Sequence, residues 1–283
     1  MKNYTLILGF FDGIHLGHRK VIKSAVEFCA KNNSEPVLLT FCESPAEYFN
    51  KKSKYIYSRS KNYQIINSLG VINIIEEPFS TLVDIKAENY LKKIINEYNP
   101  NAIFTGFNYT FGSKRTGNPE FLESNQAKYN YKYFCINPIM IDNIVVSSTI
   151  IKQKITKGNL AEANTMLGQN FSIISEVIKG AQIGRTLGFP TANMKYPSNI
   201  IELPFGVYKA SALEKPAILN WGVKPTLNGI EPVLEVHIPN FAGDLYGKNL
   251  EISIIKRIRS EKKFNSLEEL KAQIEKDTKA CLK

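Results

Sequence analysis

The fold of the first half of the chain is decided by one segment, Tyr4-Thr-Leu-Ile-Leu-Gly-Phe-Phe-Asp-Gly-Ile-His-Leu-Gly-His18. Its first eight residues are mostly apolar or β-favouring and stop at Asp12, which predicts a strand over residues 4–11. From His18 to Lys31, apolar residues recur at helical spacing, so a helix is expected directly after the glycine-containing turn. A strand that passes through such a turn into a helix is the first unit of an α/β fold.

The same alternation continues to about residue 140. Further strands are expected over four apolar runs, residues 37–41, 71–75, 102–107 and 133–136. Helices are expected to start near Ser60, near Ile85 and at Asn118, whose side chain can cap a helix with Pro119 in its first turn. This alternation predicts right-handed crossovers and a mostly parallel sheet covered on both faces. Such a sheet binds its ligand at the carboxyl ends of its strands.

The pattern changes beyond Ser147. Two short helices are expected, the second capped by the pair Asn159 and Glu162 and ended by Gly168. Five β-rich runs separated by turn residues follow, over residues 172–178, 206–213, 217–223, 233–238 and 250–258. They predict an antiparallel barrel, and a last helix is expected after Ser266. We therefore predict two domains, residues 1–158 and 159–283.

Composition limits the class of protein. Of the 283 residues, 43% are hydrophobic and 22% are charged, which is typical of a folded globular protein. No run approaches the roughly 18 consecutive apolar residues of a membrane span, so no membrane partner is expected. The cysteines are scattered without a CxxC pair and are expected to be reduced thiols, Cys29, Cys42, Cys135 and Cys281. With no cleavable leader pattern, these features predict a cytoplasmic protein.

The charge balance indicates phosphate-bearing partners. Thirty-six Lys and Arg against 26 Asp and Glu give a net charge of +10, which attracts nucleotides and nucleic acids alike. The basic residues are dispersed and are typical of solvated faces rather than of one nucleic-acid stripe. We expect small-molecule substrates, no nucleic acid, and a monomer or weak oligomer. A basic nucleic-acid-binding protein is the alternative from another class.

Two of the three histidines, His15 and His18, lie three residues apart at the predicted helix start. Backbone amides at a helix start attract phosphate, and residues i and i+3 share a helical face. Two imidazoles on that face can therefore hydrogen-bond to one phosphate chain. The alternative is that His15 ends a loop and His18 caps a helix, but the surrounding glycines, which allow a ligand close to the backbone, favour the phosphate site.

The segment GFFDGIHLGH, with its HxGH core, resembles the nucleotidyltransferase superfamily. Together with Thr105-Gly-Phe-Asn-Tyr-Thr-Phe-Gly112 and Ser147-Ser-Thr149, it resembles the adenylyltransferase half of the bacterial bifunctional riboflavin kinase/FAD synthetases. The resemblance implies a Rossmann-like domain in which the phosphate of FMN attacks the α-phosphate of ATP and pyrophosphate leaves. It assigns His15 and His18 to the ATP phosphates. The other ATP-site residues it implies are Gly9, Phe10, Asp12, Gly17, Asn108, Ser147, Ser148, Thr149 and Lys152.

Two positions depart from this family's pattern. The loop after the second predicted strand usually carries a histidine where this chain has Ser44. The Ser-Ser-Thr motif is usually followed by an arginine-containing run, whereas this chain has Lys152, which keeps the charge but lacks the planar fork. A kinase whose first domain binds nucleotide without making FAD is therefore the close alternative.

The most specific signal is Gly180-Ala-Gln-Ile-Gly-Arg-Thr-Leu-Gly-Phe-Pro-Thr-Ala-Asn193. From the residues alone it is a glycine-rich turn that can bring backbone amides against phosphates. Its GRTLGFPTAN core resembles the riboflavin kinase signature, and the match continues through the motifs Gly206–Tyr208, Gly222–Thr226, Leu234–His237 and Asp244–Gly247. The resemblance implies a small closed barrel whose phosphate-site residues are Gly180, Gly184, Arg185, Gly188, Pro190, Thr191 and Asn193.

The same resemblance gives roles to further side chains. Thr191 and Asn193 would hold Mg²⁺ and ATP phosphate through oxygens, the ligands that Mg²⁺ prefers. Glu235 would be the base that accepts the proton of the ribityl hydroxyl, although an outward glutamate between buried Leu234 and Val236 fits strand periodicity equally well. Arg259 and Phe264 are candidate borders of the flavin.

The predicted function is therefore bifunctional. The resemblance implies that riboflavin and ATP give FMN and ADP in the carboxyl-terminal barrel. It implies that FMN and ATP then give FAD and pyrophosphate in the amino-terminal domain. The cofactor requirement it implies is Mg²⁺, with ATP as co-substrate.

Overall fold

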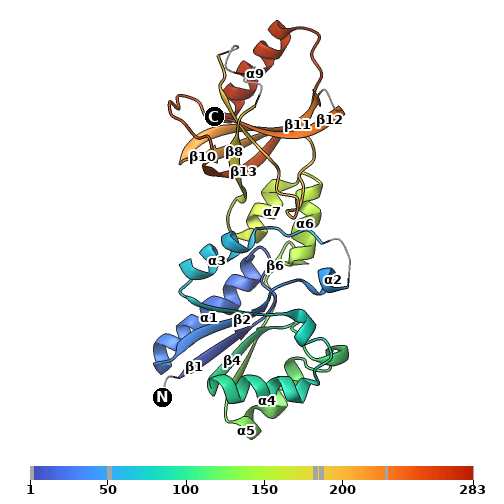
Figure 1. Cartoon of the computed structure of the whole chain (residues 1–283). Helices are drawn as coiled ribbons and strands as arrows, with labels where there is room; N and C mark the ends of the chain where they lie inside the picture. The colour runs from blue at the N-terminus through green and yellow to red at the C-terminus, as the bar shows by residue number, and fades with distance from the viewer. Residues whose placement is uncertain (1–2, 50–52, 181–183, 185–187, 227–228, 283) are drawn as a thin grey trace. The chain divides into compact units, whose positions relative to one another are not determined.

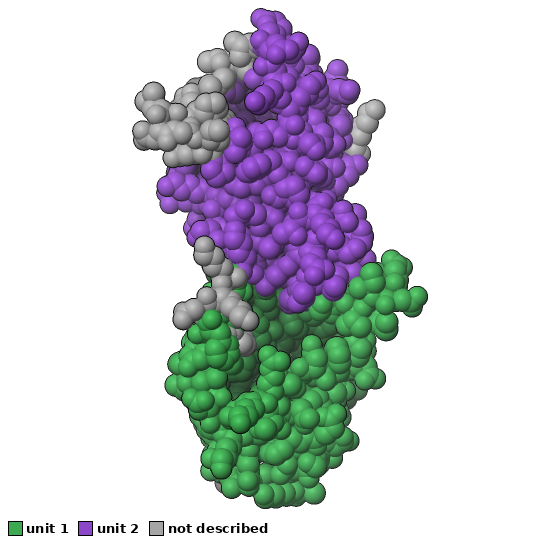
Figure 2. Space-filling model, turned by 90° about the vertical axis from the view of Figure 1, so that its right-hand side faces the viewer, with its two compact units in different colours: residues 1–53, 59–147 green, residues 54–58, 148–283 purple. Residues whose placement is uncertain are grey.

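A computed structural model describes residues 3–49, 53–180, 184, 188–226 and 229–282. The chain forms two compact units, residues Met1–Ser53 with Arg59–Ser147, and residues Lys54–Ser58 with Ser148–Lys283 (Figure 2). The chain therefore passes from one unit to the other three times.

The first unit is built on a five-stranded sheet in the order β3-β2-β1-β4-β5. All neighbouring strands pair in parallel. The strands are β1 Tyr4–Leu8, β2 Glu35–Phe41, β3 Asn73–Glu77, β4 Pro100–Gly106 and β5 Lys132–Ile136. The order reverses between β1 and β4, and a sheet of this kind opens a ligand crevice at such a switch point. The predicted parallel α/β fold is confirmed.

Helices cover both faces of this sheet (Figure 1). They are α1 Leu16–Asn32, α2 Pro45–Tyr48, α3 Arg59–Ser68, α4 Ala87–Tyr98 and α5 Pro119–Tyr129, with 3-10 turns η1 Phe79–Thr81 and η2 Ser113–Arg115. Side chains alternate along β4: Ile103 packs in the core that holds Leu91 and Ile94 of α4, whereas Phe104 meets Phe28 of α1 at 5.6 Å between ring centroids. A short hairpin follows β5, formed by β6 Met140–Ile141 and β7 Ile144–Val145.

The second unit is a closed antiparallel barrel in the order β10-β11-β12-β9-β8-β13. Its strands are β8 Phe171–Ile178, β9 Thr191–Met194, β10 Gly206–Ala212, β11 Lys215–Thr226, β12 Gly229–His237 and β13 Asn249–Ser260. Two helices precede it, α6 Ser148–Thr156 and α7 Leu160–Leu167, and one follows it, α9 Leu267–Leu282. The predicted barrel with its terminal helix is confirmed.

A five-residue strap, residues 54–58, belongs to this second unit although it lies between α2 and α3 in the sequence. The Tyr55 amide donates to the Asn199 carbonyl at 2.8 Å, and the Ile201 amide donates to the Tyr55 carbonyl at 2.7 Å. The Tyr57 ring stacks on Phe171 with centroids 6.0 Å apart. The strap is thus held by backbone pairing and by apolar burial.

Three local expectations differ from the structure. β1 ends at Leu8 rather than residue 11, because the chain bends at Gly9 and enters the turn that leads to α1. The expected capping pair does not form: Asn159 makes no side-chain capping bond, and Glu162 instead pairs with Lys154. Residues 191–194 are a strand and not only a loop, since β9 pairs with both β12 and β8.

The domain boundary predicted at residue 158 stays a prediction. The compact units change at Ser147 and Ser148, so α6 groups with the barrel by its internal contacts.

Two candidate catalytic sites

The first candidate site lies where β1 ends and α1 begins. His15 is the N-cap of α1, and its Nδ1 accepts a hydrogen bond from the His18 amide at 3.3 Å. The two imidazoles stack with centroids 3.7 Å apart and planes 19° from parallel. A Cβ at Gly17 would lie 3.1 Å from Cε1 of His15, so a larger residue there would crowd the imidazole. The structure therefore brings both predicted histidines together.

Both histidines are neutral at physiological pH. Burial lowers the pKa of His15 from 6.5 to about 4. Burial and the neighbouring His15 lower the pKa of His18 well below its ordinary value. Because the His15 Nδ1 accepts a backbone hydrogen bond, its single proton must lie on Nε2, where it can be donated to a ligand oxygen. Within the described part of the chain, the buried Nδ1 of His18 has no hydrogen-bond partner.

The other predicted residues of this site fall into two groups. Asp12 is 1% exposed in the turn after β1, close in sequence to Gly9 and Phe10. Asn108 lies in the exposed turn after β4, the neighbour of β1 in the sheet. Val146, which precedes Ser147, lies near Gly17, since its carbonyl oxygen is 3.9 Å from a Cβ built there. Ser148, Thr149 and Lys152 belong to the second compact unit, on α6.

The two departures from the family pattern have local partners. Ser44 is buried and forms a reciprocal cap at α2: its hydroxyl accepts from the Glu47 amide at 3.2 Å, and the Glu47 carboxylate accepts from the Ser44 amide at 3.1 Å. The Lys152 ammonium lies 5.7 Å from the centre of the Tyr55 ring. Ser44 therefore has a structural task, and Lys152 has a cation–π partner within its own unit.

An aromatic cavity of about 250 Å³ in the first unit was missed by the sequence analysis. It is lined by Phe41, Phe49, Phe79, Leu82, Val83, Tyr90, Thr110, Phe111, Gly112, Lys114 and Arg115. Lys114 and Arg115 both have left-handed backbone angles, with φ of 52° and 58°, a strained state that clusters at ligand sites. Phe111 and Gly112 end the motif that begins at Thr105, which is the one sequence signal that pointed here.

The second candidate site is a row of polar side chains across three barrel strands. Glu235 on β12 is opposite Asn193 on β9 and opposite Asn220 on β11, and directly opposed residues share a face at about 5 Å. The Asn220 amide donates to Oε2 of Glu235 at 3.4 Å. Leu234 and Val236 are fully buried, so Glu235 points away from the barrel interior.

The next row of the same face holds Thr191 and His237, which are opposite one another. His237 donates from Nδ1 to the Pro190 carbonyl at 2.8 Å and meets the Phe189 ring edge-on at 5.5 Å between centroids. His237 therefore fixes the backbone of the motif next to Thr191.

Two described glycines of the glycine-rich segment, Gly180 and Gly184, lie close to residues of β9 and the residues before it. A Cβ at Gly180 would lie 2.4 Å from Cγ of Asn193, so only glycine allows the chain to pass the buried amide. Gly184 is similarly close to the Phe189 carbonyl, and Gly188 has a left-handed φ of 86°. Arg185 lies outside the described residues.

The donor set here fits Mg²⁺ that arrives with ATP. Thr191 and Asn193 offer neutral side-chain oxygens beside the Glu235 carboxylate. In the described segments no group of three or more His, Cys, Asp or Glu side chains could hold a metal ion. Mg²⁺ commonly takes few protein oxygens and keeps phosphate and water ligands, so a sparse oxygen site beside a glycine-rich segment suits it.

Two cavities share Thr191. One, of about 300 Å³, lies between the barrel and α9 and contains Glu235, His237, Arg259 and Phe264 among its lining residues. The other, of about 450 Å³, is lined by Pro190, Thr191, Phe241 and residues of the Asp244–Tyr246 turn. The structure therefore places the predicted base and both predicted flavin-border residues around one cavity.

Acidification is expected to destabilise the first unit. The pKa of His15 falls from 6.5 to about 4 on folding, so the unfolded chain takes up the proton first. Stability present above pH 6.5 is then lost as the pH falls toward 4. Between pH 7 and pH 5, urea unfolding should show a loss of about 1–2 kcal/mol from this group. His15→Asn keeps a good N-cap and should remove the loss of unfolding free energy that comes from His15. If the variant and the wild type lose the same stability between pH 7 and pH 5, His15 is not the source of that loss.

The fold defines a protein of two units, an α/β unit with a candidate phosphate site and a closed barrel with a second candidate site. Residues 1–150 match the FAD synthetase family and residues 167–283 match the riboflavin kinase family. The chain belongs to the bifunctional riboflavin kinase/FMN adenylyltransferase family. The family and the bifunctional enzyme class predicted from the sequence are thereby confirmed.

Relatives with that name match along nearly the whole chain. The protein of Buchnera aphidicola subsp. Schizaphis graminum is 36% identical over 98% of this chain and 92% of its own length. That of Haemophilus influenzae is 30% identical over 99% of this chain and 94% of its own length. A solved structure described as a macrolide-efflux protein from Streptococcus pneumoniae has a TM-score of 0.88 at 28% identity, over 99% and 94% of the two chains. Among the described residues, no helix is long and apolar enough to cross a membrane.

Proposed function

We propose that the two reactions of this family run at the two sites described above. The barrel transfers the γ-phosphoryl group of ATP to riboflavin, giving FMN and ADP. The α/β unit transfers AMP from ATP to FMN, giving FAD and pyrophosphate. The observation that carries the proposal is the row Asn193–Glu235–Asn220, which puts a carboxylate beside the predicted phosphate ligands and inside a cavity.

In the barrel, Glu235 accepts the proton of the terminal ribityl hydroxyl as that oxygen attacks the γ-phosphorus. The bond from the γ-phosphorus to the bridging oxygen breaks, and ADP leaves. Thr191 lines both cavities, so we infer that the cavity with Glu235 takes riboflavin and the other takes ATP. Mg²⁺ bound with ATP would neutralise phosphate charge, and Thr191 and Asn193 would hold it. The further phosphate-site residues we propose are Gly180, Gly184, Arg185, Gly188 and Pro190.

In the α/β unit, catalysis rests on position and charge stabilisation, since no protein nucleophile is required. An FMN phosphate oxygen attacks the α-phosphorus, the bond to the β-phosphate breaks, and pyrophosphate leaves. The Nε2 proton of His15 is available to a phosphate oxygen, and His18 stacks beside it. The remaining residues proposed for this ATP site are Gly9, Phe10, Asp12, Gly17, Asn108, Ser147, Ser148, Thr149 and Lys152.

The aromatic cavity suits the flavin of this second reaction. Planar aromatic ligands pack well on aromatic walls, and Phe41, Phe79 and Phe111 line this cavity. Lys114 and Arg115 at the same cavity supply positive charge for an anionic substrate. Because Phe111 follows Asn108 in one motif, the flavin pocket and the proposed ATP site are joined by a short piece of chain.

Two further proposals concern the whole chain. We propose a cytoplasmic location, supported by free cysteines of which Cys29 and Cys281 are buried as thiols. We also retain domains 1–158 and 159–283 as functional units, which is compatible with family matches that leave residues 151–166 between them. The absence of a nucleic-acid partner and the monomeric or weakly oligomeric state stay predictions.

One assay separates the alternatives. The protein is incubated with riboflavin and Mg-ATP, and FMN and FAD are resolved chromatographically over time. We expect FMN first and then FAD, and FAD directly when FMN is supplied. FMN without FAD would favour the kinase whose first unit only binds nucleotide. Unchanged riboflavin would contradict the barrel assignment.

A further inference from the structure

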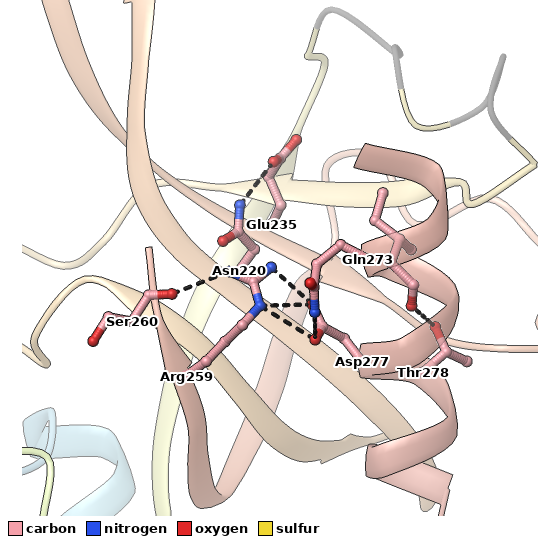
Figure 3. A network of polar contacts seen from close by, with 8 residues as sticks. Asn220, Glu235, Arg259, Ser260, Gln273, Asp277 and Thr278 are labelled. Atoms are coloured by element: carbon pink, nitrogen blue, oxygen red, sulfur yellow. Dashed lines mark hydrogen bonds and ion pairs between the residues drawn. The ribbon is translucent and has the colours of Figure 1, made fainter. Parts of the chain in front are cut away.

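An ion pair fixes α9 at the edge of the kinase cavity. The Arg259 guanidinium, at the end of β13, donates from Nε to both carboxylate oxygens of Asp277 at 3.2 and 3.0 Å, and from Nη2 to Oδ2 at 2.8 Å. Gln273, one turn earlier on α9, donates to Oδ1 of Asp277 at 2.8 Å. Figure 3 shows these three side chains pointing toward one another. The carboxylate therefore has three donor groups arranged around it.

This pair is more than a surface contact. The Asp277 side chain is 5% exposed and that of Arg259 is 23% exposed. Both residues line the cavity that holds Glu235. A buried carboxylate beside a bidentate guanidinium is geometrically specific, because the planar fork is held in one orientation. Removing one partner leaves a poorly solvated charge beside the cavity.

All three nitrogens of the Arg259 guanidinium are hydrogen-bonded at the edge of the cavity. Nη1 of Arg259 donates to the Ser260 carbonyl at 3.0 Å, so each of the three guanidinium nitrogens has at least one acceptor. The centre of the guanidinium lies 5.9 Å from the centre of the Phe264 ring. The hydrogen bonds to Asp277 and Ser260 hold the guanidinium plane in one orientation at the edge of the cavity.

The rest of the cavity divides by polarity. Val207 and Ile218 of the barrel and Leu270 and Ile274 of α9 give it apolar walls. Its polar residues include Glu235, where the proposed chemistry occurs. A ligand with a flat aromatic body and a hydroxylated tail fits this division, with the body against the apolar walls and the tail at the carboxylate.

We propose that Asp277 is a positioning residue of the kinase site, which orients Arg259 so that its guanidinium plane forms a wall for the flavin ring. This inference rests on the proposed riboflavin kinase function of the barrel. Asp277 acts through Arg259 and does not itself touch the reacting atoms. Its effect is therefore on riboflavin binding and much less on the chemical step.

The central test is Asp277→Asn in the full-length chain. The amide keeps the size of the side chain but loses the charge that fixes the fork, so KM for riboflavin should rise about 3- to 30-fold, the range of a lost cation–π contact. The kcat for FMN formation should change by less than about threefold. Quenching of riboflavin fluorescence in the presence of ADP should show the same loss of affinity without turnover. The KM for FMN in FAD synthesis should stay at the wild-type value.

Matched variants separate positioning from folding. Arg259→Lys keeps the charge without the planar fork and should reproduce the KM increase, whereas Asp277→Glu should recover part of the affinity. Thr278→Val is the control on α9, since the Thr278 hydroxyl donates to the Ile274 carbonyl of its own helix at 2.7 Å and Thr278 is not among the residues that line the cavity. It should leave KM unchanged.

The outcomes distinguish the inference from its premise. Wild-type protein that makes no FMN would remove the proposed kinase function itself. The positioning role would be overturned if the wild type is active and both variants, Asp277→Asn and Arg259→Lys, have a riboflavin KM within twofold of the wild-type value. The ion pair would then only hold α9 against the barrel. If Asp277→Asn fails to fold, the same KM and fluorescence measurements are made on Arg259→Lys and Gln273→Leu. Unchanged values in both variants would overturn the positioning role of Asp277.

Discussion

Replacement of Glu235 by glutamine is expected to lower kcat for FMN formation by about 10²- to 10⁴-fold, the usual contribution of a general base. Glutamine has nearly the same shape and can still accept a hydrogen bond from Asn220, which now lies 3.4 Å from the carboxylate. It cannot take the proton of the ribityl hydroxyl. The KM for riboflavin should therefore stay near the wild-type value. Initial rates of FMN formation from riboflavin and Mg-ATP measure both parameters.

The control for this variant is Glu176→Gln on β8. Glu176 is an exposed strand glutamate of the same barrel, and it lies outside the residues that line the Glu235 cavity. It should retain wild-type kinetics. FAD formation from supplied FMN should be normal in both variants, because it uses the other unit. Near-normal FMN formation by Glu235→Gln would show that Glu235 is only an outward strand residue.

Much of the fold was predictable because the buried faces of helices and strands give apolar residues a regular spacing in the sequence. β4 was expected within two residues of its ends, since a parallel strand buried on both faces is a continuous apolar run. β9 was not expected as a strand. Its four residues follow a glycine-rich turn and have no alternation long enough to separate from it, so only pairing with β12 and β8 defines the strand.

The candidate sites were predictable where the residues are neighbours in sequence. His15 and His18 share one helix start, and Thr191 and Asn193 share one strand. The aromatic cavity was not predictable in this way, because Phe41, Phe79 and Phe111 come from segments far apart in the sequence and each alone is indistinguishable from a core residue. The Arg259–Asp277 pair joins a strand to a helix 18 residues later, and no periodicity encodes that contact.

The strap could not be predicted for a related reason. Ile56 and Tyr57 are buried at 0% and 2% exposure, but within a sequence of alternating elements they resemble an ordinary linker between two helices. The partners of the strap, Phe171 for Tyr57 and Ile200 for Tyr55, are more than 100 residues away. Only the folded chain reveals that the barrel unit includes a piece of the amino-terminal half.

The second large effect is expected from the double variant His15→Ala, His18→Ala. FAD formation from FMN should fall by about 10²-fold or more, since removal of one preorganised donor to a developing charge costs about 10²- to 10³-fold. FMN formation should continue at the wild-type rate, because Glu235 and Thr191 lie in the other compact unit. With riboflavin as the starting substrate, FMN should therefore accumulate. Time courses that resolve both flavins measure the two rates in one reaction.

Loss of the α1 cap must be separated from loss of chemistry, because His15 also accepts a hydrogen bond from the His18 amide. Alanine at an N-cap costs about 1 kcal/mol of stability, whereas asparagine is among the best caps. His15→Asn should therefore fold as stably as the wild type at pH 7 and, with an amide that can still donate, retain more FAD synthesis than the alanine variant. Equal FAD synthesis in the wild type and the double alanine variant would remove the imidazoles from the mechanism. Loss of FMN formation as well would show that the two units do not act independently.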